Sequence, residues 1–367
     1  MVSCSVYREK SFFARAFPAP AYLAMPAMGV DISDYAIKYI ALSKVKENIT
    51  LEAHGKVDLP FEVIERGEIK DSETVAKLLS RIKEEHGYNF VHLALPEEHA
   101  YLFQTQVPKG SPEEVEQLLE FHLKDNVPIG VEEAVFDYSV LSESEHEYTL
   151  NVSVYPQSIA KQYTEVLEVA GLKVLSMEIE GQATARALVT EKQSSPTLIV
   201  DIGRNSANLS IAQNGEVTFT AILEMGGDNI TRTIARELNI SFQEAEKLKR
   251  EKGFCDLPEA KMVFDCLFPL VNKFADAIQK HVMYWHMHMA TKDSGVGEVG
   301  RVILVGGNAN VKGLSAYLEA VLEIPVDVGD VWGTIFSYEE YVPPIHASSS
   351  LEYTTAIGAA LRNILRT

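Results

Sequence analysis

The chain has 367 residues, a net charge of −19 and a hydrophobic fraction of 46%. This length exceeds one typical hydrophobic core and predicts two or more domains. The excess of 52 acidic over 33 basic residues argues against binding to nucleic acid, because such binding needs cations for the phosphates. Cys4, Cys255 and Cys266 have neither metal-site spacing nor a paired framework, which favours a reducing compartment.

The N-terminal segment is apolar and aromatic over residues 11–28 and resembles a signal peptide. However, Pro18, Pro20 and Pro26 interrupt any spanning helix, and the run is short for a bilayer. We therefore interpret residues 1–27 as a tail that packs on the body of the protein, with a membrane-surface anchor as the alternative.

The first informative motif is a predicted strand–turn–strand hairpin over residues 28–42, with Asp31 at the end of its first strand. Turn amides can face phosphate oxygens while the carboxylate faces Mg²⁺ or its waters. Ser33 and Asp34 in the turn are candidate contacts. Lys38 is better explained as a surface or cross-strand lysine than as a phosphate ligand.

The following segment alternates strands and helices, and its pattern changes at residue 96. Residues 96–173 are predicted to form an inserted α/β domain, and this insert shows no catalytic constellation. The predicted elements around and within it are strand 49–59, helix 72–85, strands 91–95 and 101–107, a helix opened by Ser111 and Pro112, hairpin 136–155, helix 158–170, strand 174–179 and a helix to residue 189.

A second hairpin follows over residues 198–212, with Asp201 and Gly203 at its turn and Asn205 at its tip. One such hairpin is weak evidence for phosphate binding. Two of them, half a chain apart, favour a duplicated α/β fold that grips one nucleotide, although each alone is compatible with an ordinary β-hairpin.

Three glycine-containing or polar segments complete the pattern. Gly226 and Gly227 precede a helix over residues 229–238, and Glu246 and Lys249 lie three apart on the next helix, where a plain salt bridge is the competing interpretation. A buried strand, 301–305, ends in Gly306, Gly307 and Asn308, and the two glycines would allow backbone to approach a flat ligand closely.

The long helix predicted over residues 258–289 carries His281, His286 and His288. Their spacing does not place them on one face, so helix packing around Trp285 is favoured over a metal site. The C-terminal helix, 354–365, is predicted to bury its small and apolar residues.

In this order, the Asp31 hairpin, the Asp201 hairpin and the Gly306–Gly307 turn resemble the phosphate 1, phosphate 2 and adenosine motifs of the actin-like ATPases. The segments around Gly226 and Glu246 resemble those of the bacterial FtsA and MreB branch, and within it the chain is most similar to the type IV pilus assembly family PilM. The resemblance begins near residue 28. It departs from the pattern at Ser33, where the family usually has Gly, and at bulky Tyr35.

The resemblance implies a duplicated actin-like (ribonuclease H-like) fold with an inserted subdomain of the 1C type. It divides the chain into a tail (1–27), a first half (28–95 and 174–192), the insert (96–173) and a second half (193–367). It further implies ATP and Mg²⁺ as ligands, with Asp31 and Asp201 on the metal side and Glu180 as a weak candidate for positioning the attacking water. Turnover is expected to be slow or absent.

The same resemblance implies a cytoplasmic adaptor, peripheral to the inner membrane, that binds the N-terminal peptide of a PilN-like membrane protein through the insert. The acidic balance favours a basic peptide. Two alternatives stay open: an FtsA-like filament protein and, less favoured, a sugar-kinase-type phosphotransferase.

Overall fold

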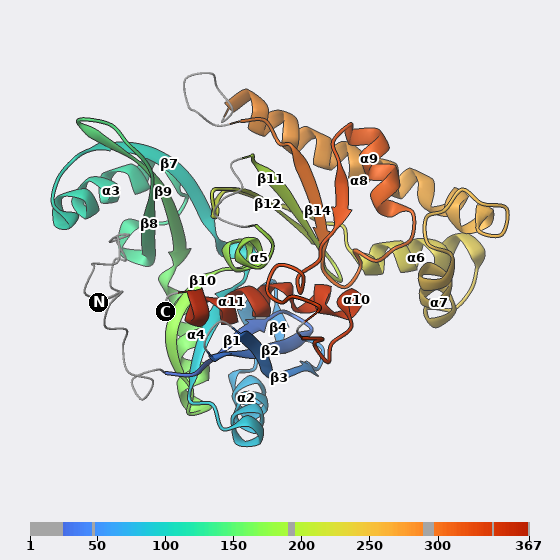
Figure 1. The fold of residues 1–367 in the computed structure, drawn as a ribbon, viewed down its shortest axis with the longest axis horizontal. Coiled ribbons are helices and arrows are strands. Elements are labelled where there is room, and N and C mark those ends of the chain that lie inside the picture. The colour runs from blue at the N-terminus through green and yellow to red at the C-terminus, as the bar shows by residue number, and fades with distance from the viewer. Residues whose placement is uncertain (1–24, 46–47, 190–194, 289–296, 340, 366–367) are drawn as a thin grey trace. The chain divides into compact units, whose positions relative to one another are not determined.

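The computed structural model describes residues 25–45, 48–189, 195–288, 297–339 and 341–365. The chain divides into two compact units (Figure 1). Unit 1 holds the described residues up to Ala183 and those from Ala356 on, and unit 2 holds the described residues from Thr184 to Thr355. The predicted N-terminal tail lies almost entirely outside the described residues.

Unit 1 is built on a five-stranded mixed sheet in the order β10-β6-β1-β2-β3. The central strand β1 pairs antiparallel with β2 and parallel with β6, which pairs parallel with β10. Parallel strands end at the same edge of the sheet, so the residues that follow β1, β6 and β10 are brought together there. The strands are β1 (Ala27–Ile32), β2 (Ala36–Val45), β3 (Asn48–Asp58), β6 (Phe90–Leu95) and β10 (Lys173–Ile179).

Helices α2 (Ser72–His86) and α4 (Gln157–Val169) bury apolar residues in the core of unit 1. Asp71 caps α2 through Thr74 N, and Gly87 ends it in a left-handed conformation. A two-stranded ribbon, β4 (Ile64–Glu65) and β5 (Glu68–Ile69), lies between β3 and α2 in the sequence, and α5 (Glu180–Leu188) follows β10.

Within the predicted insert, residues 101–156 form a three-stranded antiparallel sheet in the order β7-β9-β8, which has its own hydrophobic cluster with α3. In contrast, α4 falls within the predicted range but packs in the core of unit 1. Ser111 and Glu114 form a capping box at the start of α3. The elements are η2 (Glu97–His99), β7 (Tyr101–Pro108), α3 (Pro112–Asn126), η3 (Val131–Glu133), β8 (Ala134–Glu143) and β9 (Glu147–Pro156).

Unit 2 repeats the sheet of unit 1 strand for strand, in the order β15-β14-β11-β12-β13. Its central strand β11 again pairs antiparallel with the next strand and parallel with β14. The duplication predicted from the two hairpins is therefore present in the topology. The strands are β11 (Thr197–Ile202), β12 (Ala207–Gln213), β13 (Glu216–Leu223), β14 (Arg301–Val305) and β15 (Val326–Val328).

The helices of unit 2 are α6 (Gly227–Leu238), α7 (Phe242–Lys252), α8 (Lys261–His288), α9 (Leu314–Leu322), α10 (Ala347–Ser350) and η4 (Leu351–Tyr353). The last helix, α11 (Thr354–Leu365), packs in unit 1 from Ala356 on. A Cβ on Gly29 would lie 2.1 Å from Ala356 O, and one on Gly358 would lie 1.7 Å from Ala183 O. These glycines let α11 lie directly on β1 and α5. Within the described part of the chain, no helix is long and apolar enough to span a membrane.

Candidate functional site

The second hairpin, Asp201 to Ser206, is closed by Gly203 N, which donates to Ser206 O at 2.9 Å. The start of α6 docks on it, because Gly227 N donates to Gly203 O at 3.0 Å. Asn308 Nδ2 donates to the same oxygen at 2.8 Å. A Cβ on Gly226 would lie 2.5 Å from a carbonyl oxygen of the hairpin. Three segments that the sequence singled out therefore meet in unit 2.

Gly227, Gly306 and Gly307 differ in how strongly the surrounding structure excludes a side chain. A Cβ on Gly227 would lie 2.0 Å from the side chain of Asn308. Gly306 has φ +87°, and a Cβ there would lie 2.3 Å from Asp201 Oδ1. In contrast, Gly307 is exposed, and the nearest atom to its added Cβ is 3.9 Å away. The fold requires Gly227 and Gly306, whereas Gly307 leaves backbone surface open for a ligand.

Lys249 ties these segments together from the inside. It is 4% exposed, and its Nζ lies 2.7 Å from Glu246 Oε2, 3.0 Å from Asn308 Oδ1 and 3.4 Å from Gly227 O. Thr231 Oγ1 donates to Glu246 Oε2 at 2.6 Å. Lys249 is thus more than a surface salt bridge, because it joins α7 to the start of α6 and to the turn after β14.

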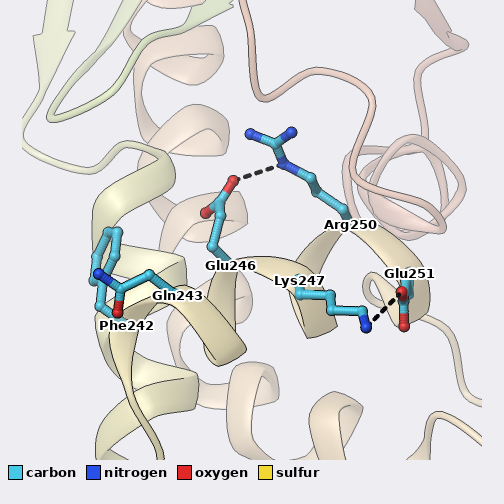
Figure 2. A pocket seen from close by; sticks show the side chains of 6 residues that line it. All are labelled: Phe242, Gln243, Glu246, Lys247, Arg250 and Glu251. Atoms are coloured by element: carbon cyan, nitrogen blue, oxygen red, sulfur yellow. Dashed lines mark hydrogen bonds and ion pairs between the residues drawn. The ribbon is translucent and has the colours of Figure 1, made fainter.

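Glu246 connects this internal network to the surface. Burial raises the pKa of its carboxyl, but hydrogen bonds from Lys249, Thr231 and Arg250 outweigh that effect and lower the pKa. Figure 2 shows Glu246 paired with Arg250 on the outer face of α7. This face borders an open hollow of about 610 Å³. The lining residues are Phe242, Gln243, Glu246, Lys247, Arg250 and Glu251.

The first hairpin, in unit 1, carries a buried carboxylate. Asp31 is 3% exposed and stands directly opposite Lys38 in the register of β1 and β2. Lys38 Nζ donates to Asp31 Oδ2 at 2.9 Å, so Lys38 is a cross-strand lysine that also reaches the hairpin carboxylate. Asp31 Oδ1 is buried and has no hydrogen-bond partner among the described residues. A buried carboxylate oxygen left in this state fits a ligand or ordered water.

The turn of the first hairpin repeats that of the second. Ser33 N donates to Ala36 O at 3.0 Å, as Gly203 N does to Ser206 O, and Ser33 Oγ donates to Ala36 O at 3.1 Å. The two oxygens of Asp34 accept hydrogen bonds from Arg66 N at 2.9 Å and Gly67 N at 3.0 Å. Asp34 therefore supports the β4–β5 turn, and the Ser33 side chain closes its own turn.

Acidic residues follow the parallel strands at the same edge of the unit 1 sheet. Glu97 comes after β6, and its Oε2 accepts a hydrogen bond from Gly181 N at 2.9 Å. Glu180, the first residue of α5, comes after β10. Burial raises the pKa of the nearby Tyr163 hydroxyl, and the negative charge of Glu180 and its neighbours raises it further. Glu97 and Glu180 thus place acidic side chains at the edge of the sheet where β6 and β10 end.

Three residues of these networks were missed in the sequence. Thr231 lies one helical turn after Gly227, Glu97 follows a buried strand within two residues, and Arg250 lies four residues after Glu246. Those spacings are the sequence signals that could have identified these three residues. Arg204, at the tip of the second hairpin, binds Asp228 with Nε at 3.1 Å from Oδ2, a further contact that connects the hairpin to α6.

The histidines of α8 are held by packing. His281 lies 6.0 Å from Phe219 between ring centroids, and burial lowers the pKa of its imidazole. His286 Nε2 accepts a hydrogen bond from Val299 N at 3.0 Å, and His288 stacks on a tyrosine ring of the same helix. Nowhere in the described ranges do three or more His, Cys, Asp or Glu side chains form a group that could hold a metal ion by themselves.

Comparison with known proteins identifies the family. A model of the family described as "Type IV pilus assembly protein PilM" matches residues 29–364. The ethanolamine utilization protein EutJ of Escherichia coli is 32% identical over 117 residues, which are 32% of this chain and 38% of EutJ. The cell division protein FtsA of Bacillus subtilis is 30% identical over 105 residues, 28% of this chain and 24% of FtsA. The chain therefore spans well under half of these curated relatives.

Solved structures establish the fold. The PilM-PilN type IV pilus biogenesis complex superposes with a TM-score of 0.76 and 20% identity, over 93% of this chain and 99% of the matched chain. MreB5 of Spiroplasma citri bound to ADP gives a TM-score of 0.53 and 14% identity, over 93% of this chain and 97% of that chain. The predicted duplicated actin-like ATPase fold is confirmed.

Proposed function

Because the chain belongs to the type IV pilus assembly protein PilM family, we propose that it is an ATP-binding adaptor of a type IV pilus assembly platform. In this proposal the two hairpins and the Gly306–Gly307 turn serve the nucleotide, and the insert serves a membrane partner. The protein is cytoplasmic and reaches the inner face of the membrane through that partner.

The observation that carries nucleotide binding is the contrast between Gly306 and Gly307. Gly306 is required by its φ of +87° and by its contact with Asp201, whereas a Cβ on Gly307 would meet nothing within 3.9 Å. The exposed backbone of Gly307 suits a flat ligand that must approach closely, such as a nucleoside. The hollow on α7 presents Arg250 and Lys247, which suit the polar and charged parts of a nucleotide.

The metal and phosphate groups fit the two hairpins. In unit 2, the Asp201 carboxylate suits Mg²⁺, and the Gly203 amide holds the turn in shape by its bond to Ser206 O. In unit 1, Asp31 has one buried oxygen without a described partner, and Lys38 beside it would offset phosphate charge. Bound Mg²⁺ would neutralise the phosphates, and one or two carboxylates per ion suffice because Mg²⁺ keeps several waters.

Hydrolysis is proposed to be slow or absent. The Ser33 side chain occupies the turn where the family usually has glycine, and its hydroxyl donates to Ala36 O. Asp31 is already engaged by Lys38. Glu180, at the start of α5, is the group proposed to orient a water.

The insert is proposed as the docking site for a basic peptide from a PilN-like membrane protein. Residues 96–173 contain 15 acidic and four basic residues, a net charge of −11. On the sheet face opposite α3, Gln104 of β7 stands in register with Asn151 of β9. The Gln104 Nε2 atom is buried and has no hydrogen-bond partner within the described ranges. β7 is an edge strand of this sheet, so a peptide that pairs with its backbone would lie beside the Gln104 side chain.

A binding assay tests this proposal. The labelled cytoplasmic N-terminal peptide of the PilN-like protein from the same organism is titrated with full-length protein and followed by fluorescence anisotropy. We expect Gln104→Leu to weaken peptide binding at least fivefold without lowering thermal stability, because its amide is already unpaired. Gln117→Leu, an exposed glutamine of α3, is the matched control. Equal peptide affinities of wild type and Gln104→Leu would exclude this face as the docking site.

A further inference from the structure

The outer side of α8 carries a ridge of mostly exposed residues, with Cys266 half-buried. Its residues are spaced alternately by four and three, which keeps them on one face of a helix. The α8 ridge consists of Met262, Cys266, Pro269, Lys273, Asp276, Lys280, Met283 and Met287. The opposite side of the helix is buried, with Leu267, Ile278 and Trp285 at or below 2% exposure.

The ends of the α8 ridge are apolar and exposed. Met262 is 63% exposed at the first end, and Met283 and Met287 are 54% and 66% exposed at the other. Large apolar side chains gathered in this way on the surface of a soluble unit mark an interaction site more often than isolated ones do. Figure 1 shows α8 as the longest helix of unit 2.

The centre of the α8 ridge is charged, with alternating signs. Lys273, Asp276 and Lys280 are exposed, and none of them forms an ion pair with another described residue. Asp265, beside the ridge, lies 3.1 Å from Lys261. These exposed charges are available to a partner that carries the complementary pattern.

We propose that the α8 ridge is a contact between two copies of this chain, with the two α8 helices antiparallel about a two-fold axis. Antiparallel alignment places Lys273 opposite Asp276 of the second copy, and the reverse pair follows by symmetry. The same alignment places Met262 opposite Met287 of the second copy, and Cys266 opposite Met283 of the second copy. Lys273 and Asp276 thus meet opposite charges, the methionines and Cys266 meet apolar or thiol groups, and Lys280 lies opposite Pro269 of the second copy.

The second copy is favoured over other occupants because the pattern is self-complementary. A unit that binds its own copy through a two-fold axis must carry both members of each pair on one surface, and the α8 ridge does. A purely basic or purely apolar face would have indicated a lipid surface or an unlike protein instead. The 28 residues of α8 span about 42 Å, which supports a small interface and a weak, concentration-dependent dimer. Such a dimer would present two peptide-docking inserts.

Charge exchange tests this proposal. Sedimentation equilibrium of the full-length protein should show a monomer–dimer equilibrium. Lys273→Asp or Asp276→Lys alone should weaken dimerisation about tenfold or more, since two like-charge pairs replace two opposite ones. The double variant Lys273→Asp/Asp276→Lys should restore affinity to within about threefold of wild type. Lys247→Asp, an exposed lysine of α7, is the control and should leave dimerisation unchanged.

A crosslink gives an independent measurement. Met283→Cys should form an intermolecular disulfide with the native Cys266 of the second copy under mild oxidation, and adding Cys266→Ser should abolish that bond. A wild-type protein that stays monomeric at all accessible concentrations would overturn the proposal. So would a double variant that associates no better than either single variant. The nucleotide and peptide titrations do not depend on dimerisation. If the dimer proposal fails, those titrations still test the proposed adaptor function.

Discussion

The substitutions Gly306→Ala and Gly307→Ala distinguish a glycine that the fold requires from one that nucleotide binding is proposed to require. At Gly306 an alanine must adopt φ +87°, which costs about 1–2 kcal/mol. Its Cβ would also lie 2.3 Å from Asp201 Oδ1 and 2.6 Å from Ile202 O, and such overpacking costs about 1–3 kcal/mol. We therefore expect Gly306→Ala to lower the free energy of unfolding by about 2–5 kcal/mol in urea denaturation.

At Gly307 the same substitution meets only Glu352 Cβ at 3.9 Å. The free energy of unfolding should change by less than about 0.5 kcal/mol. If a nucleotide contacts this backbone, the added methyl group should weaken Mg²⁺-ATP binding by about 1–3 kcal/mol, or about 5–150-fold. Isothermal titration calorimetry on the folded variant measures this. Wild-type ATP affinity in Gly307→Ala would refute the inference that the exposed glycine faces the nucleotide.

Three further predictions concern the supports of the site. Lys249→Met should lower the free energy of unfolding by about 2–4 kcal/mol in urea, because the Glu246 carboxylate and the Asn308 amide oxygen lose the buried cation that joins them. Lys247→Met, which breaks an exposed pair, should cost under about 1 kcal/mol. The fold lowers the pKa of the Glu246 carboxyl below its unfolded value of about 4.3. The ionised carboxylate therefore stabilises the folded protein fully above that value, and this stabilisation disappears as the pH falls through the folded pKa. In urea titrations between about pH 6 and pH 3, the free energy of unfolding should fall less in Glu246→Gln than in the wild type. Arg362→Met, which leaves buried Glu178 without its 2.8 Å partner, should lower the melting temperature markedly.

The elements with strong local signals were predictable. Both hairpins and the C-terminal helix over residues 354–365 appear where the sequence indicates them, since alternation and small-residue patterns are local. The expected core face of that helix is confirmed, with Ile357, Ala360 and Leu361 buried. In contrast, the exact start of α9 at Leu314 depends on tertiary contacts, because Gly313 adopts a left-handed conformation against Phe254.

The partners within the site could not be predicted, because they depend on contacts between distant segments. Asp34 is bound by amides 32 and 33 residues away, and no local pattern reveals that. Lys249 reaches Asn308 only because α7 and the turn after β14 meet in unit 2. In contrast, the pairing of Asp31 with Lys38 follows from the hairpin register, and the cross-strand role expected for Lys38 is confirmed.

The central claim is that this family member binds Mg²⁺-ATP through the carboxylate of the second hairpin. The most direct measurement is equilibrium titration of labelled ATP with Mg²⁺ against wild type and Asp201→Ala, with thermal melts to confirm folding. The expected loss of a charge-assisted or metal-mediated contact is about 1.5–3 kcal/mol, or about 10–150-fold in affinity. Equal ATP affinities of the two folded proteins would contradict the account.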